Sequence, residues 1–271
     1  MRLEKMHYAT AAIAALCAVS AASAQSSPAA AKRSSDAAAA PLAKPTIVLV
    51  HGAFADGTGW QYVIPLLEKD GYNVIAVQNP LSSLADDIAT TKRVIDAQKG
   101  SVVVVGHSYG GVVITGAAAG NPNVKALVYV AAFAPEANEP VGPFTEKYPS
   151  SLGKALRPDA AGYLYVDRAM FHDVFAADVS ATESSVMSAA QKPVSASVFG
   201  ATLPTAAWKT IPSWYLVARN DRAINPDLER FYAKRMGATT SEVTSSHVPF
   251  VSQPKIVARL IEKAAVASAK R

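Results

Sequence analysis

The strongest chemical signal in the sequence is a serine flanked by glycines. Ser108 lies in the segment Gly106-His107-Ser108-Tyr109-Gly110, directly after the valines at 102–105 and before a run of small and apolar residues at 112–119. This order is typical of a strand that turns sharply into a helix, which holds a serine side chain exposed at the end of the strand. The five-residue pattern alone can arise by chance, but its context favours Ser108 as a nucleophile.

A serine hydroxyl is a weak nucleophile at neutral pH and needs a base within hydrogen-bond reach. Where this turn carries the nucleophile, the chain order is serine, acid, histidine. Of the five histidines, only His247 follows both Ser108 and a plausible acid. The other four are not expected to act as the base. His7 lies in the amino-terminal segment 1–24, His51 ends the first predicted strand, His107 lies inside the serine turn and His172 lies in the segment 134–207. His247 is therefore the predicted general base.

Three acidic residues follow the predicted strand at 213–218, namely Asp221, Asp227 and Glu229. Asp221 is nearest the carboxyl end of the strand, where a short loop can hold it rigidly, so we expect it to orient the histidine. Asp227 and Glu229 resemble the cap and first turn of a helix, where acids favour the helix dipole. Two alternatives stay open: Glu136, after the preceding strand, could be the acid, and Asp221 could be a solvated loop carboxylate.

An attacked carbonyl develops negative charge on oxygen, which needs preorganised N–H donors. We expect one donor to be the backbone N–H of Tyr109, directly after the nucleophile. The other is the backbone N–H of Ala53, in the loop His51-Gly52-Ala53-Phe54 that follows the first strand. His51 is expected to tie this loop down rather than to take part in catalysis.

The elements that position these residues alternate along the chain. Apolar runs predict strands at 47–50, 73–77, 102–105, 126–130, 213–218 and, weakly, 242–244. Helical spacing predicts helices at 84–98, 112–119, 228–236 and 255–265. Such alternation indicates an α/β fold with a doubly wound, mostly parallel sheet. One domain, 45–271, is expected.

Residues 134–207 interrupt the alternation and are too long for a simple loop. They hold no convincing buried strand, and their aromatic residues are spaced as in short helices. We expect a helical cap over the site, the alternative being a helical excursion packed elsewhere. Five residues are assigned to the substrate pocket: Phe54, Tyr163, Phe171, Phe175 and Val248. Trp208, Trp214 and Phe250 are assigned to the core or the pocket wall.

The amino-terminal residues 1–24 have the pattern of a removable export signal. Arg2 and Lys5 give a basic start, an apolar run covers 11–19, and Ala22-Ser23-Ala24 offers a small-residue cleavage site. The apolar run is well short of the roughly 20 residues that span a bilayer, which disfavours the alternative of a membrane anchor. Residues 25–44, rich in Ala, Ser, Pro and Lys, are expected to form a disordered linker. The predicted location is periplasmic or secreted.

The composition excludes several other classes of function. The net charge of +5 is modest and comes from scattered residues, so no nucleic-acid partner is expected. The one cysteine, Cys17, falls within the predicted signal, so the mature chain could use neither a thiolate nucleophile nor a disulfide. No phosphate-binding loop and no metal-spaced cluster is found, so neither cofactor nor metal is expected.

Residues 46 to about 262 resemble the α/β-hydrolase superfamily, and within it the branch of plant hydroxynitrile lyases and methyl-ester esterases. The resemblance rests on 51–60, on 106–111, on Asp221 and on Ser246-His247-Val248-Pro249. It implies a sheet of about six strands and the cleavage of a small-molecule ester without a cofactor.

The chain departs from the lyases of this branch at two positions. They have a lysine directly after the catalytic histidine and a threonine in the oxyanion loop, where this chain has Val248 and Gly52. The sequence therefore predicts an exported serine esterase that forms an acyl-enzyme on Ser108, and it disfavours a cyanohydrin lyase. A ligand-binding protein of the same fold with slow turnover is the alternative from another class.

Overall fold

The computed structural model describes residues 43–269. The predicted export signal at 1–24 lies outside the described residues, as does nearly all of the predicted linker at 25–44. The first strand begins at Thr46, where the sequence indicates the start of the ordered domain.

Six parallel strands form the central sheet in the order β2-β1-β3-β4-β8-β9. Their bounds are β1 Thr46–Val50, β2 Val74–Val77, β3 Val102–Ser108, β4 Val124–Ala132, β8 Ser213–Ala218 and β9 Thr239–Val243. The prediction of a mostly parallel sheet of about six strands is confirmed. The last strand lies earlier than the predicted 242–244, because its exposed polar residues give it no apolar run.

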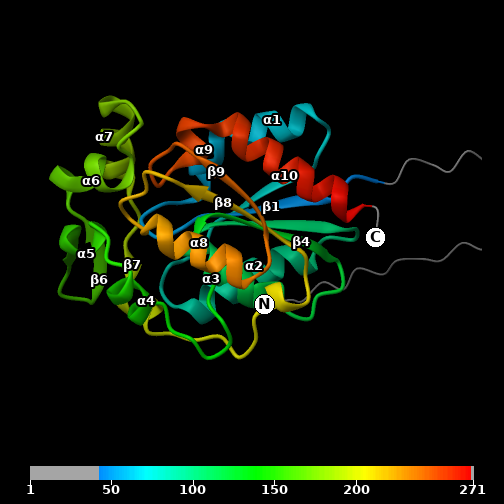
Figure 1. Cartoon of the computed structure of the whole chain (residues 1–271), viewed down its shortest axis with the longest axis horizontal. Helices are drawn as coiled ribbons and strands as arrows, with labels where there is room; N and C mark the ends of the chain where they lie inside the picture. The colour runs from blue at the N-terminus through cyan, green and yellow to red at the C-terminus, as the bar shows by residue number, and fades with distance from the viewer. Residues whose placement is uncertain (1–42, 270–271) are drawn as a thin grey trace, which may run out of the picture. The chain divides into compact units, whose positions relative to one another are not determined.

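Helices cover both faces of the sheet, with α1 and α10 on one face and α2, α3 and α8 on the other (Figure 1). Their bounds are α1 Ile64–Lys69, α2 Leu84–Asp96, α3 Gly110–Ala117, α8 Pro226–Arg235 and α10 Pro254–Ser268. The short helices η1 Gly57–Tyr62 and α9 Pro249–Ser252 follow β1 and β9. β3 is buried along its whole length, which explains why its sequence is a continuous valine run.

The chain reverses direction across the sheet between β1 and β3. From β1 it goes to β2 on one side, and then passes over β1 to β3 on the other. In parallel sheets of this kind, ligands bind outside the carboxyl ends of the strands at such a switch point. The loops after β1 and β3 are the ones from which the sequence predicts the oxyanion donors and the nucleophile.

The insertion between β4 and β8 contains more than the predicted helices. Its helices are α4 Gly142–Lys147, α5 Leu152–Ala155, α6 Arg168–Phe175 and α7 Ala181–Ala190, with the 3-10 turns η2 Ala196–Phe199 and η3 Ala207–Lys209. It also forms a small antiparallel sheet of β5 Leu156–Pro158, β6 Tyr163–Val166 and β7 Val194–Ser195. These strands are two to four residues long, and most of their residues are half-buried or exposed. They are therefore too short to produce an alternating apolar pattern in the sequence.

Candidate active site

Ser108 lies at the tip of a tight turn between β3 and α3. Its φ is 52°, a left-handed conformation that is costly for a residue other than glycine. The flanking glycines are required sterically, because a Cβ at Gly106 would lie 2.6 Å from the Gly110 oxygen, and a Cβ at Gly110 would lie 2.6 Å from the Val50 oxygen. The backbone strain at Ser108 and the lack of space for a Cβ at the two glycines both indicate that this turn serves to place the serine side chain.

His247 and Asp221 form a buried pair. His247 follows β9, Asp221 follows β8, and His247 Nδ1 lies 2.5 Å from Asp221 Oδ2. A carboxylate oxygen can only accept, so the proton of the neutral imidazole lies on Nδ1 and leaves the lone pair of Nε2 free. Asp221 Oδ1 accepts the backbone N–H groups of Ala223 at 2.7 Å and Ile224 at 2.9 Å, which fixes the carboxylate in place.

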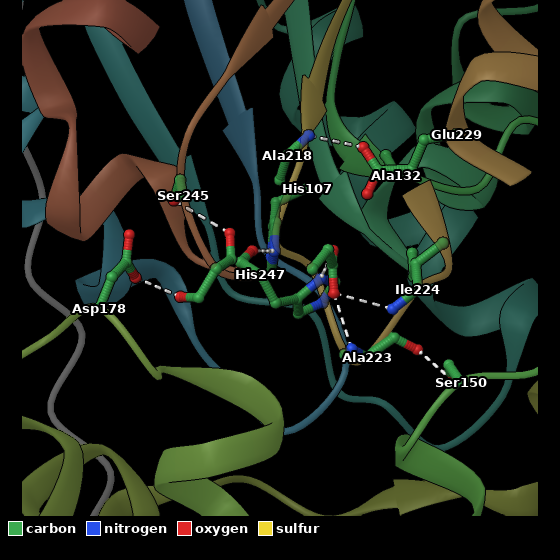
Figure 2. A network of polar contacts seen from close by, with 12 residues as sticks. His107, Ala132, Ser150, Asp178, Ala218, Ala223, Ile224, Glu229, Ser245 and His247 are labelled. Carbon is green, nitrogen blue, oxygen red and sulfur yellow. Dashed lines mark hydrogen bonds and ion pairs between the residues drawn. The ribbon is translucent and has the colours of Figure 1, made fainter. Parts of the chain in front are cut away.

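His107 connects the nucleophile turn to the loop of His247 (Figure 2). Its Nε2 lies 2.9 Å from the backbone oxygen of His247, and the two rings lie 4.6 Å apart between centroids. Burial lowers the pKa of His107 well below its ordinary value, so the ring is neutral and donates its single N–H to this oxygen. This role could not be predicted from the sequence, because the partner is 140 residues away.

The loop after β1 packs directly on Ser108. A Cβ at Gly52 would lie 2.8 Å from the Ser108 Cβ, so only glycine allows this approach without a shift. His51 holds the loop, since its Nδ1 lies 2.8 Å from the Gly52 oxygen and its Nε2 accepts the Asn79 N–H at 3.0 Å. Among the described residues, no hydrogen bond outside the helices and strands uses the backbone N–H of Ala53, the predicted oxyanion donor in this loop.

Tyr109, the other predicted oxyanion donor, is the N-cap residue of α3. Its side chain is buried, and its hydroxyl donates to Asp87 Oδ2 at 2.8 Å. This bond anchors the residue that directly follows Ser108. Its backbone N–H, like that of Ala53, takes no part in the loop and turn hydrogen bonds of residues 43–269.

An apolar pocket lies between the cap and the loops of the core. It is lined by Phe54, Ala55, Asp56, Thr58, Gly59, Phe171, Phe175, Met187, Ala190 and Phe250. Phe175 connects the pocket to the base, because its ring stands edge-on to the ring of His247 with 4.8 Å between centroids. Thus three of the five residues predicted for the pocket line it. Tyr163 lies in β6 and Val248 is buried at the N-cap of α9, and neither lines this pocket.

The remaining acidic candidates lie in different surroundings. Glu136 forms a surface ion pair with Lys209 at 2.8 Å, and Asp227 is exposed and pairs with Arg230 at 2.9 Å. Glu229 lies in the first turn of α8, as predicted, but it is wholly buried beside Asp221, which the helix-dipole interpretation did not anticipate. Asp178, from the cap, accepts the hydroxyl hydrogen bond of Ser246 and was not anticipated.

Within residues 43–269, no three His, Cys, Asp or Glu side chains gather as they would around a metal ion. None of the helices in that part of the chain has the length and apolar character needed to cross a membrane.

Comparisons with known proteins give the family of this chain. The alpha/beta hydrolase family model matches residues 47–260. The chain is 27% identical over 249 residues to the alpha/beta hydrolase nvfD of Aspergillus novofumigatus, covering 83% of this chain and 98% of that protein. It is 32% identical over 123 residues to an alpha-hydroxynitrile lyase of Arabidopsis thaliana, covering 39% of this chain and 48% of the lyase.

A solved structure of similar fold is a pyrethroid hydrolase from Sphingobium faniae. Its TM-score is 0.69 at 25% identity, and the match covers 84% of this chain and 99% of that one. The family match spans most of the described residues, including Ser108, Asp221 and His247. This chain belongs to the alpha/beta hydrolase family.

Proposed function

We propose that this hydrolase cleaves carboxylic esters through an acyl-enzyme on Ser108. The observation that carries the proposal is the buried pair of His247 and Asp221, 2.5 Å apart, whose histidine is hydrogen-bonded through His107 to the turn that holds Ser108 at a φ of 52°. An imidazole whose Nδ1 proton is fixed by a carboxylate presents Nε2 as a base, which is what a serine nucleophile requires.

In the proposed reaction, the Ser108 oxygen attacks the ester carbonyl carbon while His247 Nε2 accepts the hydroxyl proton. Asp221 stabilises the resulting imidazolium. The carbonyl oxygen becomes an oxyanion, which the N–H groups of Ala53 and Tyr109 are proposed to stabilise. The alcohol leaves with the proton from His247. Water, activated by the same nitrogen, then attacks the acyl carbon and releases the acid and free Ser108.

Two features favour an ester hydrolase over a cyanohydrin lyase, even though a lyase is among the similar proteins. Val248, directly after the base, is buried and apolar, so it supplies no charge to a leaving cyanide. Gly52 has no hydroxyl, and a larger residue there would approach Ser108 within 2.8 Å. Cyanohydrin cleavage would therefore lack the groups that the lyases place at these two positions.

The pocket suggests the kind of ester. The rings of Phe54 and Phe175 meet edge to face at 6.3 Å between centroids, and Phe171 packs on Phe175 at 5.0 Å. A wall of aromatic rings next to His247 favours a bulky apolar group on one side of the ester bond. We propose that esters with such a group are cleaved with a lower KM than short aliphatic ones.

Steady-state hydrolysis of a p-nitrophenyl ester series by residues 25–271 tests the proposal. The parent should turn over repeatedly, and Ser108→Ala should lose at least about a thousandfold in kcat. Ser101→Ala, at an exposed serine directly before β3, is the matched control and should keep parental activity. Release of a single equivalent of nitrophenol without further turnover would instead favour a ligand-binding protein with slow hydrolysis.

We also propose that the protein works after export, to the periplasm or outside the cell. The support is the basic start at Arg2 and Lys5 followed by the apolar run and the Ala22-Ser23-Ala24 segment. Mass spectrometry of the protein from the extracytoplasmic fraction should find Gln25 as the first residue. A first residue of Met1 in that fraction would contradict cleavage.

A further inference from the structure

Glu229 has a buried carboxyl group beside Asp221, the partner of His247. It lies in the first part of α8, and its exposed fraction is 0%, although its neighbours Asp227 and Arg230 carry exposed ion-pairing side chains. Fully buried acidic side chains are rare unless they are paired or neutral. The position therefore calls for an explanation that a helix-dipole preference does not supply.

The end of β8 provides one partner for this side chain. The pairing of β4 with β8 ends at Val130 and Leu216, so beyond that point the N–H of Ala218 has no acceptor in β4. Glu229 Oε2 accepts this N–H at 3.0 Å (Figure 2). One of the two carboxyl oxygens thus completes the backbone hydrogen bonding where the strands separate.

The other oxygen has no donor. Glu229 Oε1 is buried and meets no N–H or O–H group among the described residues. Asp221 is the neighbouring acid, because its backbone N–H donates to the Ala218 oxygen at 3.1 Å and its carboxyl group lies in contact with that of Glu229. Two ionised carboxylates cannot share a buried contact, so one of the pair must hold a proton.

The hydrogen bonds decide which carboxyl group is protonated. Asp221 accepts two backbone N–H groups and faces the N–H of His247, so three donors already surround its carboxylate. Glu229 accepts only one N–H. Burial and the negative charge of Asp221 raise the pKa of Glu229 well above its ordinary value.

The other groups around Glu229 do not change this assignment. Tyr215 of β8 is uncharged, with its hydroxyl on the Ala132 oxygen. Arg230 of α8 is bound by Asp227 and Glu242 at the surface. Tyr232, on the same helix, is also uncharged because burial raises its pKa. The positive charge of Arg230 acts to lower the pKa of Glu229, but burial and the charge of Asp221 outweigh it.

We propose that Glu229 is a positioning residue that keeps its proton at neutral pH and donates it to Asp221 in a hydrogen bond. This inference rests on the proposed function, since it gives Asp221 the task of orienting His247. The bond holds the Asp221 carboxylate together with the N–H groups of Ala223 and Ile224, so that Oδ2 stays directed at His247 Nδ1. No proton is transferred during turnover.

Infrared spectroscopy of the resting protein tests the protonation state without reference to activity. The parent at neutral pH should show a carbonyl stretch of a protonated carboxyl group that is missing from Glu229→Gln. Asp227→Asn, an exposed acid on the same helix, is the matched control and should retain that band. A spectrum in which the parent and Glu229→Gln do not differ in this region would overturn the proposal.

Kinetics test the positioning role with two variants of similar size. Glu229→Gln keeps an acceptor for Ala218 and an N–H donor for Asp221, so kcat should stay close to that of the parent. Glu229→Leu keeps neither, and kcat should fall by roughly 10- to 100-fold, since a misplacement of about 1 Å can cost about 100-fold. KM should change little, because Glu229 does not line the pocket.

Equal loss of kcat in the Gln and Leu variants would overturn the positioning role, as would full activity of the Leu variant. The infrared result separates this inference from the proposed function. If the parent hydrolyses no ester but shows the band, the ester-hydrolase proposal fails and the protonated Glu229 stands. If the parent is an active esterase without the band, only the inference fails.

Discussion

The Nε2 of His107 donates a hydrogen bond of 2.9 Å to the backbone oxygen of His247. The residue next to Ser108 thereby fixes the backbone of His247, across 140 residues of sequence. Because both rings are buried, no water competes for this bond. The relative placement of Ser108 and His247 thus depends on a neutral histidine that itself performs no chemistry.

Replacing His107 should therefore reduce turnover without abolishing it. His107→Leu leaves the His247 oxygen without its donor and should lower kcat by about 10- to 100-fold through loss of alignment. His107→Gln offers an amide donor and should recover part of that loss. Steady-state kinetics on a nitrophenyl ester would measure both, and parental kcat in the Leu variant would show that the bond is dispensable.

Asp221→Asn tests the orienting acid. The amide cannot fix the Nδ1–H tautomer of His247, and kcat should fall by up to about ten-thousandfold. Asp227→Asn is the control, because Asp227 lies at the surface with Arg230 and contributes on the order of 1 kcal/mol or less to stability. If Asp221→Asn kept its activity while Glu136→Gln lost it, the acid would have been assigned to the wrong strand.

Acid should destabilise the fold through His51. Burial is the main cause that lowers the pKa of His51 from 6.5 to about 4. The Nε2 of His51 already accepts the Asn79 N–H. Protonation of Nε2 would therefore turn it into a donor that faces another donor, the Asn79 N–H. Because the pKa of His51 is lower in the folded than in the unfolded protein, neutral His51 contributes its full share of the unfolding free energy above pH 6.5. This contribution is lost as the pH falls, and the loss reaches about 3 kcal/mol at pH 4.

Urea unfolding at pH 7 and pH 4 would measure this effect. The loss of unfolding free energy between the two pH values should be smaller in His51→Gln than in the parent by about the same 3 kcal/mol. Comparing the change within each protein cancels the cost of the substitution itself. The same loss in both proteins would count against His51 as a source of acid sensitivity.

The cap should influence the base through Asp178, which accepts the hydroxyl hydrogen bond of Ser246, the residue before His247. Asp178→Ala should lower kcat by about tenfold, equivalent to about 1.4 kcal/mol. Asp173→Ala removes another cap carboxylate, which pairs with Arg222 and is 66% exposed, and should have little effect. A parental kcat for Asp178→Ala would show that the cap does not stabilise the loop of Ser246 and His247.

The sequence was most informative where local geometry constrains residue type. The turn around Ser108 tolerates only glycine at Gly106 and Gly110 because backbone oxygens lie 2.6 Å from their missing Cβ atoms. The run of valines in β3 indicates a strand that is buried on both faces of the sheet. Hence the sheet, the sharp turn at Ser108 and the pairing of the acid after β8 with His247 could be predicted from short segments.

Contacts between distant segments could not be predicted in this way. Glu229 has the sequence context of an exposed helix acid, and its burial follows from the separation of β4 and β8 beyond Leu216. Asp178 meets Ser246 across 68 residues, and nothing near either of them signals the other. The strands of the cap, such as β7 at Val194–Ser195, are stabilised by pairing rather than by their own sequence.

The most direct test of the central claim is to find which atom a serine-directed reagent modifies. A fluorophosphonate should react with the parent to give one phosphonyl adduct, and peptide mass spectrometry should locate it on Ser108. Ser108→Ala should remain unmodified, and His247→Ala should react at least about a thousandfold more slowly, because the hydroxyl has lost its base. Labelling of Ser108→Ala at the parental rate, or an adduct on another residue of the parent, would contradict the assignment of Ser108 as the nucleophile.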